Sequence, residues 1–234
     1  NPSEIIGSNP RPLDYSLYRR IITHRAWNEG LRPLGYCSLD EDLMYQVGNK
    51  PYINLNYSFY SLTPEALPKE LTARLVEYYH HCLQKDWSAH DKIEFEIVYS
   101  CYDFMTERNS RKLLEHGFTE EERSQVVSEL KKLTLDAIYR HKALLDQDRN
   151  SINVLEFTRM EIEKIGANCN NVKELIETVR WLLEAITRYG TPQFARQARM
   201  AFMARAFLRS LVDAGYCTQE EIDRFMQSIT TVST

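Results

Sequence analysis

The sequence is short of glycine, of paired cysteines and of long apolar runs, and each shortage excludes a class of protein. With only eight glycines in 234 residues, it has no GxxxxGK[ST] or GxGxxG stretch in which backbone amides could approach a phosphate closely. It also lacks the GxSxG and HExxH patterns of hydrolases and zinc proteases. The five cysteines form no CxxC pair, which favours free thiols in a reducing cytosol. No apolar run is long enough to span a bilayer.

An excess of positive charge is missing as well. The chain carries 29 Lys and Arg against 33 Asp and Glu, a formal net charge of -4. Proteins that bind along a nucleic acid need basic side chains to neutralise its phosphates, so this balance argues against a nucleic-acid partner. The hydrophobic share of 43% and the charged share of 26% are those of an ordinary globular protein. We expect a cytoplasmic protein without a membrane segment.

The second half of the chain has the apolar spacing of helices. Apolar residues recur every three or four positions from residue 119 onward, which predicts a helical bundle with buried stripes over 119–234. The stripes take in Val126, Leu130, Leu133, Ile138, Met160, Ile162, Ile165, Leu175, Val179, Leu182, Phe194, Ala198 and Phe202.

Helix starts and stops can also be read from the sequence. Two capping boxes, in which a Thr and a Glu three residues later satisfy free backbone amides, predict helix starts at Thr119 and Thr218. Glycines often end helices in the left-handed conformation. Such ends are predicted at Gly117, Gly166, Gly190 and Gly215.

The first half, residues 1–118, predicts a mixed α/β lobe. Helices are expected over 13–30 and 68–85. Between them, "LMYQVGNKPYINLNYSFYSL" has two strand-like runs around a Gly-Asn-Lys-Pro turn, the pattern of a β-hairpin whose second strand reaches Tyr60. The stretch "DKIEFEIVYSCY" alternates again and predicts a third strand. The expected fold class is therefore mainly α (α+β), a helical bundle with a small antiparallel sheet lobe.

Four polar residues before and along that third strand are candidate site residues. His90 and Asp91 precede it, and Glu94 and Glu96 would lie on one face about 7 Å apart. Two carboxylates near an imidazole could bind a cation, orient a hydroxylated substrate or share acid/base work. The other interpretation is that both glutamates form the solvated face of an edge strand.

Two further groups of side chains carry open alternatives. The 14 tyrosines, many of them in the first half, suit a pocket for rings or sugars but also suit helix packing. Arginines recur after Pro192, at Arg196, Arg199, Arg205 and Arg209. They could bind phosphate or carboxylate, or they could form a solvated face or pair with acidic helices.

Several stretches resemble, in order, the central helical region of the phosphoenolpyruvate synthase and pyruvate phosphate dikinase superfamily. They are "NPSEIIGSNPRPLDYSLYRRIIT", "GNKPYINLNYSFYSLTP", "HDKIEFEIVYSCYDF", "YGTPQFARQAR" and "SITTVST". A more distant similarity is to rifampicin phosphotransferases. The resemblance implies a middle part excised from a longer protein, between an ATP-grasp domain and a swivelling phosphohistidine domain. ATP and Mg²⁺ would belong to that parent, with no cofactor in this segment.

The leading hypothesis is a substrate-recognition and docking module of such a phosphotransferase. It would hold an unknown small-molecule acceptor by hydrogen bonds while the phosphohistidine domain delivers phosphate, so that proximity accelerates the transfer. No catalytic residue or metal ligand is expected in it. The expected pocket residues are Arg11, Tyr52, Asn54, Asn56, His90, Asp91, Glu94 and Glu96. The group that it resembles often has Asp and Arg at the positions of Asn54 and Asn56.

Two alternatives belong to other classes of protein. One is a non-catalytic helical scaffold for domain or subunit assembly, suggested by the long patterned bundle. The other is a metal-dependent enzyme that uses His90, Asp91, Glu94 and Glu96 as its site.

Overall fold

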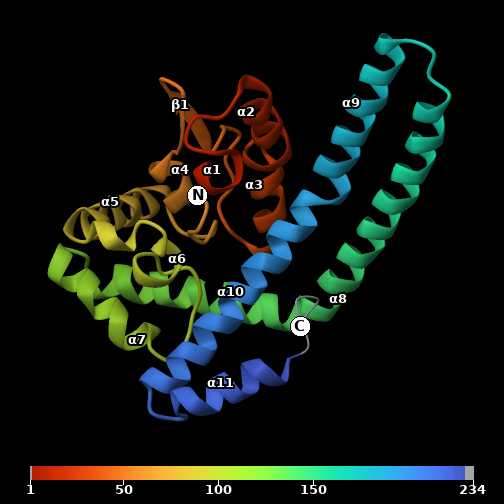
Figure 1. The fold of residues 1–234 in the computed structure, drawn as a ribbon. Helices are drawn as coiled ribbons and strands as arrows, with labels where there is room; N and C mark the ends of the chain where they lie inside the picture. Colours follow the sequence, from red (N-terminus) through yellow and green to blue (C-terminus); the bar gives the residue numbers. More distant parts are fainter. Residues whose placement is uncertain (1, 230–234) are drawn as a thin grey trace.

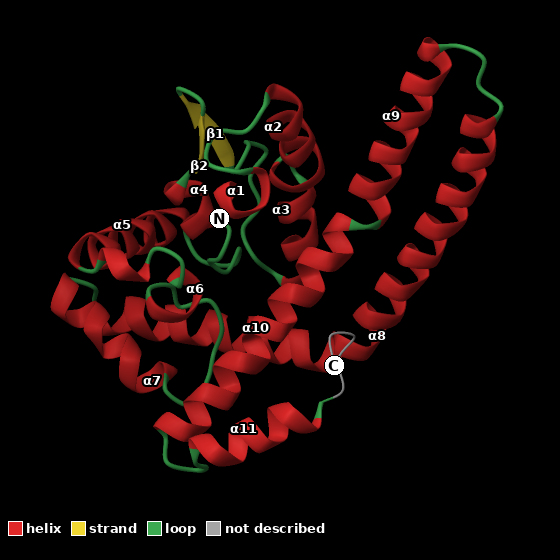
Figure 2. Cartoon of the chain, in the orientation of Figure 1, coloured by secondary structure: helices red, strands yellow, loops and turns green. Residues whose placement is uncertain are grey.

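The chain folds as a mainly α protein with one small sheet, as predicted. The computed structural model describes residues 2–229, and Figures 1 and 2 show its helices and its single β-hairpin. The helices are α1 (Pro2–Ile6), α2 (Pro12–Tyr18), α3 (Ala26–Leu31), α4 (Leu55–Tyr60), α5 (Lys69–Lys85), α6 (Ile93–Glu96), α7 (Thr106–Asn109), α8 (Glu120–Ala167), α9 (Val172–Tyr189), α10 (Thr191–Asp213) and α11 (Gln219–Ser228). Short π and 3₁₀ segments are η1 (Arg19–Thr23), η2 (Arg32–Leu34), η3 (Trp87–Ala89) and η4 (Ser110–His116).

The predicted helix over 13–30 is present but broken. It divides into α2, η1 and α3, and the break falls at Arg25, whose φ of 67° is uncommon for a residue with a Cβ. The backbone amide of His24 still donates to the carbonyl of Arg19 at 2.8 Å. The helix predicted over 68–85 is confirmed as α5.

The β-hairpin is shorter than predicted. Strand β1 (Met44–Val47) pairs antiparallel with β2 (Lys50–Ile53), and Val47 lies opposite Lys50 across a turn in which Gly48 has a φ of 60°. The second strand was expected to reach Tyr60, and this is wrong because α4 begins after Asn54. The Asn54 side chain accepts a hydrogen bond from the Tyr57 amide at 3.4 Å, which caps the helix.

The predicted third strand is also wrong. Residues 93–96 form the single turn α6, and the sheet of the described residues contains only β1 and β2. Side chains take the place of a strand partner for the backbone that comes after α6. The Tyr99 amide donates to the Tyr79 hydroxyl at 3.3 Å, and the Tyr102 amide donates to Thr134 Oγ1 at 2.8 Å.

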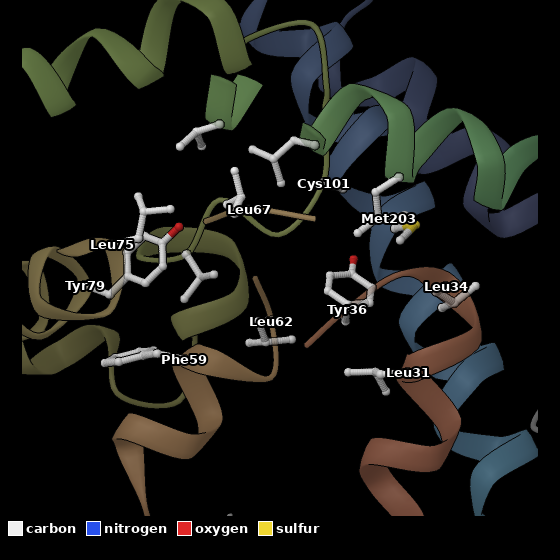
Figure 3. Close-up of a cluster of buried hydrophobic side chains, with 14 of the residues drawn as sticks. Leu31, Leu34, Tyr36, Phe59, Leu62, Leu67, Leu75, Tyr79, Cys101 and Met203 are labelled. Carbon is white, nitrogen blue, oxygen red and sulfur yellow. The ribbon is translucent and has the colours of Figure 1, made fainter. Parts of the chain in front are cut away.

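The hydrophobic core is continuous between the two halves of the chain. Figure 3 shows part of it, with Tyr36 of the first half near Met203 of α10 and with Phe59 and Leu75 farther along the same cluster. Leu113 and Leu130 are also fully buried. Residues 2–118 and 119–229 therefore share one core, and this core fixes the position of α10 under the loops of the first half.

α8 is a single helix of 48 residues. Its capping box at Thr119 and that of α11 at Thr218 are confirmed. Gly117 and Gly215 have positive φ angles of 81° and 77°, as predicted. Gly166, however, lies within α8, and Gly190 joins α9 to α10 with a φ of -122°, so neither is a left-handed helix end.

Close packing and a buried ion pair hold α10 against α3 and α8. At Gly30, a Cβ would lie 2.6 Å from the Pro192 carbonyl oxygen and 2.7 Å from the Ala195 Cβ. Arg196 Nη1 donates to Asp148 Oδ1 at 2.6 Å, and their side chains are only 8% and 5% exposed. Because a buried charge without its partner is strongly unfavourable, these contacts specify the position of α10.

The C-terminal part of α8 changes direction, leaves the body and runs antiparallel to α9 (Figure 1). We call residues 149–182 the arm. The arm is only two helices thick, so part of its predicted apolar stripe lies on the surface. Met160, Ile165 and Val179 were predicted to be buried, and this is wrong because all three are exposed. Apolar side chains at least 45% exposed on the arm are Ile152, Val154, Phe157, Met160, Ile165, Val172, Leu175, Ile176, Val179 and Trp181.

Two other large apolar side chains of the predicted stripes lie on the surface as well. Ile138 is 51% exposed and Phe194 is 69% exposed, although Val126, Leu130 and Leu133 of the same pattern are buried. Between residues 2 and 229, no helix combines the length and apolar character needed to cross a membrane.

Candidate functional site

A buried arginine on α10 holds the loop that comes after α6. The Arg199 side chain is 2% exposed. Its Nε donates to the Tyr36 hydroxyl at 3.1 Å and its Nη2 donates to Ser100 Oγ at 2.6 Å. The Tyr36 hydroxyl in turn donates to the Ser100 carbonyl oxygen at 2.5 Å. Arg199 therefore joins α10, the segment after η2 and the loop at Ser100 in one network.

The remaining nitrogen of this guanidinium faces Glu94. Arg199 Nη1 lies 3.6 Å from Glu94 Oε1 and has no hydrogen-bond partner among the described side chains and backbone. The Glu94 side chain is 19% exposed, so one of its sides remains open. Burial raises the pKa of Glu94, and the positive charge of Arg199 opposes part of that rise.

Glu94 lies in the wall of a cavity of about 550 Å³, a size typical of small-molecule sites. The cavity extends between the end of α5, the loop around Ser100 and the last turns of α10. Its polar lining includes Lys85, Lys92, Glu94, Glu96, Tyr99, Asp103, Lys112, Arg209 and Asp213. Both signs of charge are present, which suits a ligand with several polar groups.

Buried groups beside the cavity stay neutral at ordinary pH. Burial raises the pKa of the Cys101 thiol to about 11, with Arg199 opposing the rise. Burial likewise raises the pKa of Tyr36 to about 12. Tyr36 therefore remains a hydrogen-bond donor to Ser100, and Cys101 is not a thiolate nucleophile.

The two predicted glutamates both border this cavity but do not act as a pair. Glu94 faces Arg199, whereas Glu96 accepts a hydrogen bond from Arg209 Nη1 at 2.7 Å. Ten positions along α10 correspond to roughly 15 Å, so the two carboxylates are held by well-separated cations. The prediction that they share one face of a strand is wrong because α6 is a helical turn.

His90 and Asp91 lie just outside the cavity wall. Both side chains are exposed, and His90 Nδ1 donates to the carbonyl oxygen of Trp87 at 3.0 Å. They come after η3 on the surface, so the structure does not bring them to Glu94. Within residues 2–229, no group of three or more His, Cys, Asp or Glu side chains lies close enough to hold a metal ion. The structure therefore gives no support to a metal site made of these four residues.

The other predicted pocket residues lie elsewhere on the molecule. Arg11 is exposed where α2 begins, and Tyr52 is 44% exposed on β2 with its ring stacked on Tyr45 at 6.0 Å. Asn54 caps α4. Asn56 borders a second hollow of about 460 Å³, where its Oδ1 lies 2.6 Å from Nε2 of His80. The predicted site thus divides among separate surfaces.

Sequence reasoning missed the residues that organise the cavity. Arg199 is one of the arginines that recur after Pro192. Their spacing was compatible both with a solvent-exposed helix face and with ion pairs to acidic helices. The structure shows pairing: Arg196 and Arg199 are buried against carboxylates, and Arg209 pairs with Glu96 while its side chain stays half exposed. Tyr36 and Ser100 carried no sequence signal, since their partners are distant in the chain.

A second polar cluster lies apart from the cavity. Asp42 accepts hydrogen bonds from Arg19 Nε at 2.7 Å and from His24 Nδ1 at 2.6 Å. Partial burial would raise the pKa of Asp42, but these hydrogen bonds outweigh it and lower the pKa. The cluster joins η1 to the loop before β1. It borders neither the 550 Å³ cavity nor the second hollow.

Comparisons with known proteins identify no relative. No family model, no curated protein and no solved structure matches this chain. The resemblance to the phosphoenolpyruvate synthase superfamily therefore stays a prediction, and the cavity itself is the main basis for assigning a function.

Proposed function

We propose that this chain is a substrate-binding module that holds a small polar molecule in the cavity between α5, the Ser100 loop and α10. The observation that supports the proposal is Glu94 in the cavity wall, with one oxygen directed at buried Arg199 and its side chain partly open. Arg199 orients the carboxyl group, and the carboxyl group then orients a ligand through hydrogen bonds. Arg209 and Glu96 provide a second polar contact region at the same cavity.

Within this proposal, the ligand is a phosphoryl acceptor. The resemblance to phosphoenolpyruvate-utilising proteins supports this part, and so does the lack of a glycine-rich phosphate loop in the sequence. An ATP-grasp domain and a phosphohistidine domain of a parent protein would supply the phosphoryl group, and this module would supply the position of the acceptor. ATP and Mg²⁺ would then be bound by the parent and not by these residues.

Binding can be tested with a thermal-shift screen of small hydroxylated and amine-bearing compounds. A ligand present at about 100 times its Kd stabilises the folded state by about 2.7 kcal/mol, which gives a clear shift. We expect Glu94→Ala to weaken binding of any hit at least about tenfold. Glu41→Ala, at an exposed position outside the cavity, is the matched control. Hits that bind both variants equally would place the site elsewhere.

Transfer is tested separately. The purified chain is incubated with ATP or with phosphoenolpyruvate and each screening hit, first alone and then with ATP-grasp and phosphohistidine domains added. We expect phosphorylated hit only in the complete mixture. Turnover by the chain alone would overturn the proposal that it is a non-catalytic module.

A non-catalytic scaffold is the second candidate, and one observation favours it. The arm exposes ten large apolar side chains, more than the scattered exposed residues of a typical monomer. This surface is independent of the cavity, so the two candidates can both be correct.

A further inference from the structure

The two helices of the arm approach each other closely, and most of the large apolar side chains of the arm are exposed. Thr178 and Ala185 are the buried residues of α9, and both are small. At Gly166 of α8, a Cβ would lie 3.2 Å from the Thr178 methyl group, so the helices approach closely there. Ile162 of α8 is buried as well, at 6% exposed. Ten other large apolar side chains of the arm are at least 45% exposed, so most of its apolar surface is directed outward.

Most of the exposed apolar residues of α9 lie along one stripe, and Trp181 lies outside it. Val172, Ile176, Val179 and Leu183 are spaced by four, three and four positions, which places them on one face of a helix. Leu175 lies beside them. Val172 is 71% exposed, Ile176 49% and Val179 52%, while Leu183 is half-buried near the body. We call these five residues the α9 stripe.

Charged residues accompany the α9 stripe along one edge in alternating sign. Each comes one position after a stripe residue. They are Lys173, Glu177, Arg180 and Glu184. Glu177 and Arg180 pair with each other at 2.7 Å within the helix and remain 42% and 68% exposed, so both can reach a partner. Glu184 contacts Arg20 of the body at 2.7 Å.

Read in reverse, this order of charges has the opposite sign at each position, so it is complementary to an antiparallel copy of itself. When two copies of α9 lie antiparallel about a twofold axis, the same edge of each helix faces the other. The order plus, minus, plus, minus then meets minus, plus, minus, plus. Lys173 lies opposite Glu184 of the other copy, and Glu177 lies opposite Arg180 of the other copy. In parallel copies related by a twofold axis, the charged edges would lie on opposite sides of the contact, so these pairs would not form.

We infer that the α9 stripe is the contact surface for a second copy of this chain, with the two arms packed antiparallel. The inference goes beyond the proposed ligand site and does not depend on it. An antiparallel pair of two-helix arms forms a four-helix arrangement, in which the α9 stripes of the two copies become part of an interior.

The α9 stripe gives a second copy a continuous apolar surface. Val172, Ile176 and Val179 are 71%, 49% and 52% exposed on one face of the helix. Burying them against a second copy is favourable by roughly 25 cal/mol per Å² of apolar area removed from water. The net charge of the α9 edge is zero, so a second copy meets no overall repulsion.

The first test measures the oligomeric state of the 234-residue chain by sedimentation velocity from about 1 µM to about 100 µM. We expect a reversible monomer–dimer equilibrium in the wild-type chain. Ile176→Glu should raise the dimer dissociation constant at least about tenfold, because it places a charge in the apolar contact. Tyr139→Glu is the control, since Tyr139 is 81% exposed on the part of α8 that precedes the arm. Circular dichroism verifies that both variants fold.

The second test exchanges charges. Glu177→Lys and Arg180→Glu each align like charges in a homodimer, so each variant alone should dimerise at least about tenfold more weakly. The double variant restores opposite charges and should recover dimerisation. An equal mixture of the two single variants should also dimerise, because Lys at 177 of one chain then faces Glu at 180 of the other.

The outcomes divide clearly. A wild-type chain that remains monomeric at about 100 µM overturns the inference and leaves the α9 stripe to a different protein. A dimer that Tyr139→Glu weakens and Ile176→Glu does not would place the interface on the body. Single variants that fail to pair with each other would exclude the antiparallel arrangement.

Discussion

Glu94 Oε1 lies 3.6 Å from Nη1 of Arg199, and the arginine is the more deeply buried of the two, with 2% of its side chain exposed against 19%. The pair connects α6 to α10 across the wall of the cavity. A carboxyl group in this position is affected by opposing influences, burial and a nearby cation, and burial is the larger of the two. Its ionisation should therefore be measurable in the stability of the protein.

The first prediction concerns pH. Because burial raises the pKa of Glu94 above its usual 4.5, the folded protein keeps this proton at pH values where the unfolded chain has lost it. The free energy of unfolding should therefore fall as the pH rises from about 4.5 through the raised pKa. Glu94→Gln should remove this fall. Urea denaturation of both proteins between about pH 4 and about pH 8 measures it, with Glu41→Gln as the control. Parallel wild-type and Glu94→Gln profiles would contradict the prediction.

The second prediction concerns the Tyr36 hydroxyl. Tyr36→Phe removes a group that donates to the Ser100 carbonyl and accepts from Arg199 Nε. Leaving buried partners unsatisfied costs about 1–3 kcal/mol, so the free energy of unfolding measured in urea should fall by that amount. Tyr45→Phe serves as the comparison, because Tyr45 is 47% exposed and its change should stay within about 0.5 kcal/mol. Equal effects at the two positions would show that the network contributes little.

The third prediction concerns the Asp148–Arg196 ion pair. Removing one member of a buried pair leaves an uncompensated charge and costs about 3–5 kcal/mol, which is the loss expected for Asp148→Ala. Asp146→Ala provides a matched control on the same helix, since Asp146 is 58% exposed and 3.9 Å from Arg149. The double variant Asp148→Ala with Arg196→Ala should lose less than the two single losses added together. Additive losses would argue against direct coupling.

The fourth prediction concerns the contact between α3 and α10. A Cβ at Gly30 would meet backbone and Cβ atoms at 2.6 and 2.7 Å, so Gly30→Ala should destabilise the protein by about 1–3 kcal/mol through overpacking. Gly166→Ala meets only a Thr178 methyl group at 3.2 Å and gains about 0.5–1 kcal/mol of helix preference. It should therefore be clearly better tolerated in thermal unfolding. Tolerance of Gly30→Ala would mean that α3 and α10 can move apart.

The parts of this fold that could be predicted are those set by local chemistry. Thr119 and Thr218 begin helices because a neighbouring glutamate completes each capping box, and both signals lie within four residues. Gly48 turns the hairpin for a similarly local reason. These features do not depend on the rest of the chain, so the sequence alone was enough.

The stretch after His90 could not be predicted in the same way. Its alternation of apolar and polar residues is that of a strand, yet Tyr79 and Thr134 satisfy backbone amides that a strand would give to its neighbour. These partners are 20 and 32 positions away in the chain. The pairing of Glu94 with Arg199 has the same character, which is why only part of the site was anticipated.

The arm shows a different limit of pattern reasoning. Helical spacing at Leu175 and Val179 predicted helix α9 correctly, but it does not say what covers the apolar face. In the isolated chain no second layer of helices covers these two described side chains, which are 46% and 52% exposed. The spacing of apolar residues identifies which face of a helix favours burial. Only the tertiary structure shows whether another part of the same chain covers that face.

Gly190 is the single residue between α9 and α10, and its position links two surfaces that are otherwise far apart. α10 carries Arg199 and Arg209, which meet the carboxylates at the cavity, and α9 carries the exposed stripe. The backbone direction at this junction therefore sets the angle between α9 and α10, and with it where the stripe lies relative to the cavity.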